Sequence, residues 1–510
     1  MKFRISDRTL LWSLLSGLLL ALAFPRPDVA GLAWIALIPL LLVMEKRPFA
    51  AGFAAGLGFF SLVLYWLNIV MTTYGALHPA LSLVAWLLLS AYLALYFGTA
   101  TWLAWWLRKR LDMPIMLTLP VLWVALEFLR SFLLTGFPWA SLGYSQHNVL
   151  PLIQSADLGG PYILGFLIVL VNAVLADRLR RWRGGDRNLR SWLPTAAALL
   201  LWSSNVGYGQ WRLAQPLDQR DTELETRLVQ GNIDQSVKWD PVFAQATVDI
   251  YQQLSATPPG GTPADLIVWP ESAVPFYYQD GGPLGRQVRT VAGREKVWLL
   301  FGSPAYEERH RQIRLLNSAF LLDSGEEILG RSDKVHLVPF GEYVPLGRYL
   351  PFIDKLVEGV GDFVPGELQP LPMNGHRVGV LVCYEAIFPE LAREYVRRGS
   401  DLLVNITNDA WFGRSSAPYQ HLAMARFRAV ENRVWLARAA NTGISAFIAP
   451  SGRLTQTTPL FETLAIQGRV GMGAHATVYT RLGDVFPALC LLLSALTLLR
   501  ARLQRPQPAC

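Results

Sequence analysis

The chain has 510 residues, of which 52% are hydrophobic and only 16% charged, with a formal net charge of +8. Because soluble domains carry roughly 25% charged residues, this composition excludes a protein that is soluble throughout. Lysine and arginine form short clusters without the aromatic-interleaved basic face of nucleic-acid binders. The three cysteines, Cys383, Cys490 and Cys510, lack the spacing of a disulfide framework or a zinc site. We therefore expect neither nucleic acid nor a bound metal.

Charged residues are sparse in the first two hundred positions and more frequent between residues 220 and 480. This shift predicts a membrane domain over residues 1–219 with about seven transmembrane helices. A water-facing domain over 220–480 and a final transmembrane helix with its tail over 481–510 follow. The predicted spans lie near Thr9 to Phe24, Val29 to Met44, Phe49 to Val70, Pro79 to Leu107, Pro114 to Leu134, Pro161 to Ala176, Trp192 to Ser203 and Val485 to Leu499.

The short loops between these spans differ sharply in charge. One set of loops and both termini carry nearly all the arginines and lysines, while the opposite loops offer only Arg26. The positive-inside rule then predicts both termini in the cytoplasm and the 220–480 domain on the outer side of the cytoplasmic membrane. The basic start and Ala21-Leu22-Ala23 are also typical of a cleaved signal peptide, so retention of the first segment stays open.

Two charged residues, Glu127 and Arg130, occur inside the fifth predicted span at a spacing of three residues. Such spacing puts them on one face of a helix, where they can neutralise each other or contact a lipid headgroup. A transporter is a further alternative for a multi-span chain. It is disfavoured because the spans carry little other charge and show no repeated halves.

The 220–480 region alternates short β-branched runs with turns and helical stretches, which predicts an α/β domain with a buried sheet. Predicted strands are Glu225 to Ile233, Asp265 to Trp269, Val297 to Gly302, Asn317 to Leu322, Val378 to Cys383, Asp401 to Ile406 and Ser445 to Ala449. Predicted helices are Val242 to Leu254, Pro389 to Arg398 and Tyr419 to Arg438.

Three segments of this domain place a reactive side chain after a buried run, and these side chains are Glu271, Lys334 and Cys383. A cysteine attacks a carbonyl as the thiolate, and a carboxylate in a partly dry pocket can accept its proton. Glu271 is the candidate base, and the ammonium of Lys334 is the candidate group to stabilise the resulting oxyanion. Taken singly, each residue is more often structural, so the hypothesis depends on their combination.

That combination resembles the nitrilase superfamily, whose members use a Glu, Lys and Cys triad in this order on an αββα sandwich. The resemblance covers residues 224–468 and, with the predicted spans, extends to the apolipoprotein N-acyltransferases, a membrane-attached family within it. It is carried by Val229-Gln-Gly-Asn-Ile233, Trp269-Pro-Glu271-Ser, Lys334-Val-His-Leu-Val-Pro-Phe-Gly-Glu-Tyr-Val-Pro345, Cys383-Tyr-Glu385, Asn405-Ile-Thr-Asn-Asp-Ala-Trp-Phe-Gly413 and Gly136-Phe-Pro-Trp139.

The resemblance implies a transfer of an acyl chain from a membrane phospholipid to the α-amino group of a lipoprotein's N-terminal diacylglyceryl-cysteine. Cys383 would carry the chain as a thioester, with Glu271 and Lys334 as its catalytic partners. No cofactor is expected, because the phospholipid ester already holds the required energy and the sequence has no P-loop. The implied partners are therefore a phospholipid donor, a diacylglyceryl-modified apolipoprotein acceptor and the surrounding membrane lipids.

Further residues are implied to line the site: Glu342, Tyr384 and Glu385 in supporting roles, and Trp239 and Trp411 against the acyl chains. A structural role remains open for each of the five. The apolar stretch from Tyr349 to Gly366 is either a membrane-facing lid or an ordinary loop.

Two other enzymes remain as alternatives. One is a thiol hydrolase in which His421 or His336 is the base for Cys383. The other is a membrane-tethered, nitrilase-like amidase that releases its product to water, for which a single anchoring span would suffice.

Overall fold

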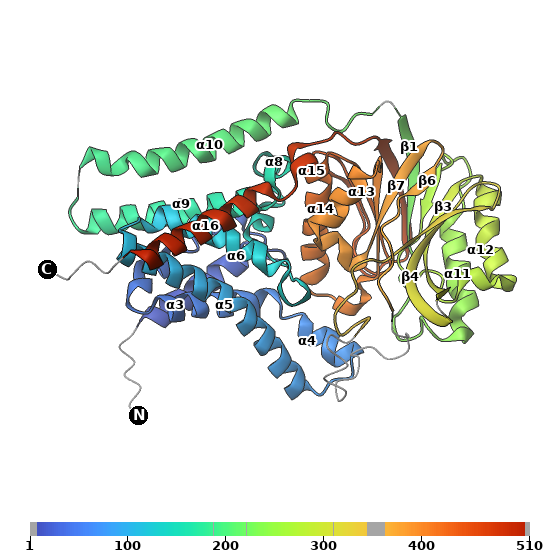
Figure 1. The fold of residues 1–510 in the computed structure, drawn as a ribbon. Helices are drawn as coiled ribbons and strands as arrows, with labels where there is room; N and C mark the ends of the chain where they lie inside the picture. The colour runs from blue at the N-terminus through green and yellow to red at the C-terminus, as the bar shows by residue number, and fades with distance from the viewer. Residues whose placement is uncertain (1–7, 187, 221, 310, 344–362, 505–510) are drawn as a thin grey trace. The chain divides into compact units, whose positions relative to one another are not determined.

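The computed structural model describes residues 8–186, 188–220, 222–309, 311–343 and 363–504. The chain forms two compact units, whose elements are labelled in Figure 1. The first contains Met1–Asn68, Pro79–Gln215 and Leu482–Cys510, and the second contains Ile69–His78 and Pro216–Arg481. The short stretch Ile69–His78, which lies within the predicted membrane part, therefore belongs to the second unit.

The first unit is built of helices that follow the apolar stretches of the sequence. Its longer helices are α1 (Thr9–Leu22), α3 (Pro48–Val63), α5 (Pro79–Leu111), α6 (Ile115–Arg130), α9 (Tyr162–Arg183), α10 (Leu193–Leu213) and α16 (Val485–Leu503). Shorter pieces are η1 (Ala30–Trp34), α2 (Ile38–Val43), η2 (Met44–Lys46), α4 (Leu67–Ile69), η4 (Leu133–Thr135), η5 (Leu142–Gln146), α7 (Leu150–Ile153), α8 (Ala156–Gly159) and η6 (Leu189–Trp192).

Fewer continuous apolar helices are present than the eight predicted spans. Among the described residues, α5, α9 and α16 are long and apolar enough to cross a membrane. A fourth is possible if α3 and the helical segment Leu67–Tyr74, bent by 55°, form one span. The predicted span from Val29 to Met44 is broken instead, because Pro39 starts the new helix α2 after the turn that follows η1. Helix α6 has 16 residues, or about 24 Å, and contains Pro120.

The two charged residues of α6 bond to the turn that begins η5. Both are buried, and Glu127 Oε1 accepts a hydrogen bond from the backbone N–H of Leu142 at 3.0 Å. Arg130 Nη2 donates to Ser141 Oγ at 2.9 Å. Of the two interpretations left open by the sequence, these contacts favour a structural role, in which the pair fastens the loop after α6.

The second unit contains two six-stranded sheets. One sheet has the order β12-β1-β2-β3-β4-β5, and its strands are β1 (Thr222–Gln230), β2 (Leu266–Val268), β3 (Trp298–Arg309), β4 (Gln312–Leu322), β5 (Ile328–Asp333) and β12 (Leu464–Met472). The other has the order β11-β10-β9-β8-β7-β6, formed by β6 (Leu371–Met373), β7 (His376–Val382), β8 (Leu402–Thr407), β9 (Leu436–Ala440), β10 (Ala446–Ile448) and β11 (Leu454–Thr457). Central strands β1, β2 and β3 run parallel, as do β7, β8 and β9.

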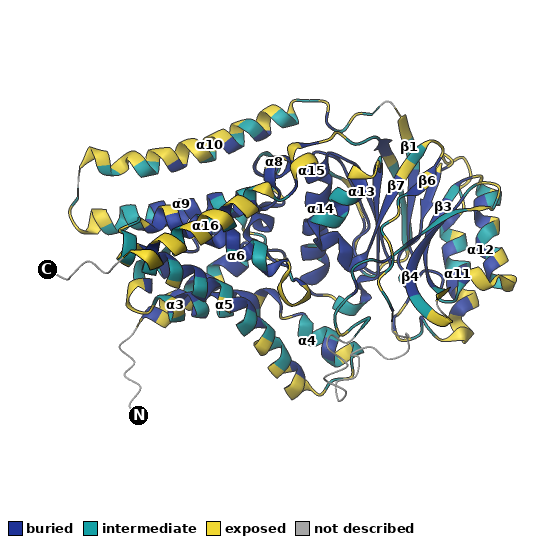
Figure 2. Cartoon of the chain, viewed as in Figure 1, coloured by how far each residue is buried: buried dark blue, intermediate teal, exposed yellow. Residues whose placement is uncertain are grey.

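Apolar side chains fill the space between the sheets and cover their outer faces. Leu300, Val404 and other buried residues of both sheets form the inner core, shown dark blue in Figure 2. Helices α11 (Ala244–Ser255) and α12 (Gly282–Glu295) cover the first sheet, while α13 (Pro389–Arg397) and α14 (Ala417–Asn432) cover the second. The predicted αββα sandwich is therefore confirmed.

One predicted helix was too long. The sequence predicted a helix from Tyr419 to Arg438, but α14 ends at Asn432. Arg433 adopts a left-handed conformation with φ of 49°, which terminates the helix, and the chain continues into strand β9. The Ala- and Arg-rich composition of β9 favours a helix locally, but Arg438 pairs with Asp409 in the buried interior.

We predict that truncating the inter-sheet core destabilises the second unit. Leu300 is fully buried, so Leu300→Ala should cost about 2–5 kcal/mol and lower the thermal unfolding midpoint measured in detergent. The control is Ile313→Ala on β4, because Ile313 is 72% exposed and its truncation removes little buried area. Equal shifts for the two variants would contradict this assignment of the core.

Candidate active site

Cys383 follows strand β7 and begins the short helix η9 (Cys383–Ile387). Its φ of 53° is left-handed, which costs an L-residue roughly 1–2 kcal/mol and persists only where surrounding contacts enforce it. Burial raises the pKa of the Cys383 thiol, and the negative charge of Glu271 raises it further, against the opposing charge of Lys334. The resting residue is therefore a protonated thiol, which needs a base before it can attack.

Glu271 lies three residues after strand β2, at the end of the parallel centre of the first sheet. Its carboxylate is held at both oxygens. Oε1 accepts a hydrogen bond from Asn317 Nδ2 at 2.8 Å, and Oε2 accepts one from the backbone N–H of Asn408 at 2.9 Å. These two donors, one on strand β4 and one directly after strand β8, orient the carboxylate.

Lys334 follows strand β5, and its side chain is only 1% exposed. Its Nζ lies 2.9 Å from Glu342 Oε1 and 3.6 Å from Glu271 Oε1. Burial alone would lower the pKa of Lys334, but the charges of Glu342 and Glu271 outweigh it and raise the pKa above its usual value. The residue is therefore a permanent buried cation.

The structure brings the three predicted catalytic residues within electrostatic reach of one another. Glu271 and Lys334 form an ion pair, and the charges of both act on the pKa of Cys383. Glu342, a predicted supporting residue, joins the same group through its bond to Lys334. Its second oxygen, Oε2, accepts the backbone N–H of Val338 at 2.8 Å, so Glu342 also orders the segment after Lys334.

Asn317 on strand β4 belongs to this group and was not predicted from the sequence. Its Nδ2 donates to Glu271 at 2.8 Å and to Glu342 Oε1 at 2.9 Å, bridging the two carboxylates. Its backbone carbonyl accepts the N–H of Lys334 at 2.8 Å. An asparagine inside a predicted strand carries no local signal of such a role; only the pairing of β4 with β5 reveals it.

Glu385, another predicted supporting residue, connects the lysine segment to the cysteine turn. Its Oε1 accepts the backbone N–H groups of Val335 at 2.6 Å and His336 at 3.0 Å, and its Oε2 accepts that of Val382 at 2.7 Å. Burial raises the pKa of Glu385 to about 7, although these three hydrogen bonds act in the opposite direction. Glu385 thus positions the residues that follow Lys334 and the residue that precedes Cys383.

The two histidines proposed as alternative bases make other contacts. His421 Nε2 donates to the backbone carbonyl of Cys383 at 3.0 Å, so it braces the turn rather than the thiol. Its Nδ1 lies 3.1 Å from Asp409 Oδ1, and Asp409 Oδ2 accepts from Arg438 at 2.7 Å. This chain of buried polar groups was not predicted. Burial and the charge of Lys334 lower the pKa of His336 to about 4, and its ring stacks on Phe388 at 3.8 Å.

The other three predicted site residues, Tyr384, Trp411 and Trp239, lie in the segments that follow strands β7, β8 and β1. Tyr384 is buried next to Cys383, and its ring packs edge-on against Phe388. Trp411 makes an edge-to-face contact with Tyr74 at 5.4 Å, within the same unit. Trp239 is half-buried, and its indole N–H has no hydrogen-bond partner among the residues described. Most of the predicted lid, from Tyr349 to Gly366, lies outside the described residues.

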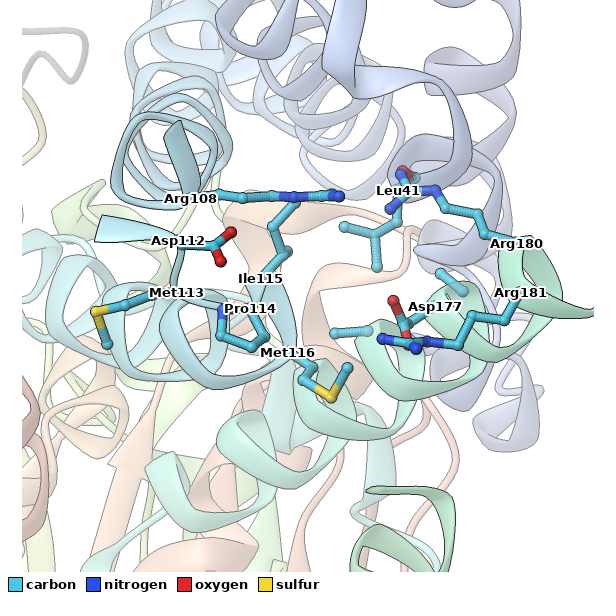
Figure 3. A pocket seen from close by; sticks show the side chains of 12 residues that line it. Leu41, Arg108, Asp112, Met113, Pro114, Ile115, Met116, Asp177, Arg180 and Arg181 are labelled. Carbon is cyan, nitrogen blue, oxygen red and sulfur yellow. The ribbon is translucent and has the colours of Figure 1, made fainter. Parts of the chain in front are cut away.

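A cavity of about 260 Å³ occurs in the first unit and contains none of the predicted site residues (Figure 3). Its charged lining is largely paired: Arg108 bonds to Glu45 at 2.8 Å and Arg181 to Asp177 at 2.6 Å. The remaining lining includes apolar side chains from α6 and α9.

Two family profiles match the sequence. Residues 16–174 match the apolipoprotein N-acyltransferase N-terminal domain, and residues 226–470 match the carbon-nitrogen hydrolase family. An amidase from Nesterenkonia sp. is a similar solved structure, with 23% identity, coverage of 52% of this chain and 95% of that one, and a TM-score of 0.37.

Relatives along nearly the whole chain are apolipoprotein N-acyltransferases. The protein of that name from Geobacter metallireducens is 48% identical, covering 96% of this chain and 94% of the relative. That from Pseudomonas putida is 36% identical and covers 97% of each chain. The Pasteurella multocida protein is 33% identical, covering 92% of this chain and 91% of its own. This chain is thus an N-acyltransferase and belongs to the apolipoprotein N-acyltransferase family.

Proposed function

We propose that this enzyme moves an acyl chain from a membrane phospholipid to the α-amino group of an apolipoprotein's N-terminal diacylglyceryl-cysteine. Cys383 would carry the acyl chain as a thioester. One observation supports this most. The thiol of Cys383 is buried and protonated, and the charges of two oriented groups, the Glu271 carboxylate and the buried Lys334 ammonium, act on it. Membership of the family supports a lipoprotein as the substrate.

In the first half of the proposed reaction, Glu271 takes the thiol proton while the sulfur of Cys383 attacks the ester carbonyl carbon of the phospholipid. The carbonyl oxygen becomes an oxyanion, which the ammonium of Lys334 stabilises. Collapse of this intermediate breaks the ester C–O bond and leaves the acyl chain on sulfur. Glu271 returns its proton to the departing lysophospholipid hydroxyl.

The second half repeats this chemistry with an amine as the nucleophile. An α-amino group has an unperturbed pKa of about 7.7–8.0, so a substantial fraction is neutral near pH 8 and able to attack. Attack on the thioester carbonyl forms the C–N bond, and collapse breaks the C–S bond. Glu271 collects the surplus proton of the amine and returns it to the thiolate of Cys383.

Water is the competing acceptor, and its exclusion separates a transferase from a hydrolase. The side chains of Glu271 and Lys334 are 8% and 1% exposed, and Cys383 is 8% exposed, so little solvent reaches the site. A dry pocket preserves the thioester until an amine arrives and strengthens the effect of each charge. The energy of the ester passes to the thioester, so the proposed cycle uses no cofactor.

The proposed location is the bacterial inner membrane, with the second unit on the periplasmic side and both termini in the cytoplasm. Three long apolar helices support insertion into a membrane. The orientation depends on the asymmetry of arginine and lysine between alternate loops.

The thioester predicts a defined covalent mass. Purified protein incubated with phospholipid vesicles and analysed by intact mass spectrometry should carry one hydroxylamine-labile acyl chain, which Cys383→Ala abolishes. Cys490→Ala is the matched control, because Cys490 is buried in α16 and has no part in the proposed chemistry. An acyl mass that survives in Cys383→Ala would contradict the proposal, and release of free fatty acid as the main product would favour the amidase-like hydrolase.

Replacing the proposed base should block thioester formation. Glu271→Gln removes the proton acceptor while keeping a similar shape, so the rate of acylation should fall by about 10²- to 10⁴-fold. His336→Asn is the comparison, because the His336 ring packs on Phe388 with the ring centres 3.8 Å apart; its rate should stay within a few-fold of wild type. The assignment of the base fails if His336→Asn loses acylation and Glu271→Gln retains it.

A further inference from the structure

The loop after strand β1, residues 231–240, contains a buried cation that the proposed reaction does not use. Lys238 is only 1% exposed, and its Nζ donates to the backbone carbonyl of Glu271 at 3.0 Å. In the part of the chain that the structure describes, no carboxylate forms an ion pair with it. An ammonium buried with a single neutral acceptor is expensive, which points to a role for its charge.

A second set of hydrogen bonds connects the 231–240 loop to the carboxylate of Glu271. Gln235 accepts a hydrogen bond from Asn408 Nδ2 at 2.6 Å, and the backbone N–H of Asn408 donates to Glu271 Oε2. Asn441 Nδ2 donates to Asn408 at 3.0 Å and to the carbonyl of Ile233 at 2.8 Å. The position of Lys238 next to Glu271 is therefore fixed by buried bonds from three segments distant in sequence.

The charged groups around Glu271 carry a net negative charge unless a second cation is present. Two carboxylates, those of Glu271 and Glu342, share the single ammonium of Lys334, which leaves one uncompensated negative charge in a buried cluster. Lys238 supplies the missing positive charge beside Glu271. Burial lowers the pKa of Lys238 to about 8, while the charges of Glu271 and Cys383 act in the opposite direction.

We propose that Lys238 is a positioning residue of the active site, whose ammonium fixes the backbone of Glu271 and supplies a buried positive charge beside Glu271 and Cys383. The inference rests on the proposed role of Glu271 as the base. It goes beyond that role by adding a second, titratable cation to the Glu271, Lys334 and Cys383 triad.

A pH dependence follows from the sign of the charge. The ammonium of Lys238 is present below about pH 8 and is lost as the pH rises through that value. The groups that face it are Glu271 after β2 and Cys383 after β7. When the cation is absent, the Cys383 thiolate loses a positive charge that favours it, so the rise of thiol reactivity with pH should move to higher pH.

The test compares Lys238→Gln, which retains a hydrogen-bond donor, with Lys238→Met, which retains neither donor nor charge. Lys296→Gln, at an exposed lysine of the same unit, is the control. Two rates are measured from pH 5 to 9 in the full-length protein: alkylation of Cys383 by iodoacetamide, and acyl-thioester formation in phospholipid vesicles. Thermal unfolding of each variant identifies any that fail to fold.

We expect both Lys238 variants to alkylate at least about tenfold more slowly near neutral pH, because the Cys383 thiolate is less favoured, with the rise of the alkylation rate displaced to higher pH by one unit or more. The control should follow the wild-type profile. A folded Lys238→Gln protein with the wild-type profile would overturn the inference, because only the charge has been removed. Absence of an acyl thioester in wild type would instead overturn the proposed function, while the alkylation profile still decides the role of Lys238.

Discussion

The ammonium of Lys334, buried between the carboxylates of Glu342 and Glu271, is the interaction on which the rest of the site depends. A buried charge without a partner costs several kcal/mol, so removing one member of this group leaves the others unpaired. The same group holds Glu271 in place through Asn317 and sets a positive charge near the thiol of Cys383. The same contacts therefore stabilise the fold and position the groups of the proposed reaction.

The αββα sandwich makes this arrangement possible by supplying rigid strand ends. Glu271 follows a strand of one sheet and Cys383 a strand of the other, so the proposed base and the proposed nucleophile come from different layers. Glu385 bonds the cysteine turn to the segment after Lys334 across this divide. Left-handed backbone at Cys383 is maintained by such contacts, including the bond from His421 to its carbonyl. Preorganisation of this kind lowers the cost of reaching the transition state.

Sequence patterns predicted the sandwich and the candidates Glu271, Lys334 and Cys383, because each follows a buried run and belongs to a recognisable motif. They did not predict Asn317 or Lys238, whose roles arise from contacts between segments far apart in the chain. Local composition also extended a predicted helix into β9, where tertiary pairing overrides helix propensity. Apolar stretches predicted the helices of the first unit, but their length alone did not reveal that the stretch from Val29 to Met44 forms short helical pieces, among them η1 and α2.

In the proposed mechanism, the acyl chain on Cys383 is an intermediate and not a by-product. A single-turnover chase tests this most directly: enzyme acylated with an isotopically labelled phospholipid is freed of lipid and then mixed with a diacylglyceryl-cysteine peptide. If Cys383 carries the intermediate, the labelled mass leaves the enzyme at the rate at which it appears on the peptide's α-amino group. Retention of the label on the enzyme, or its release as free fatty acid while the peptide stays unmodified, would contradict it.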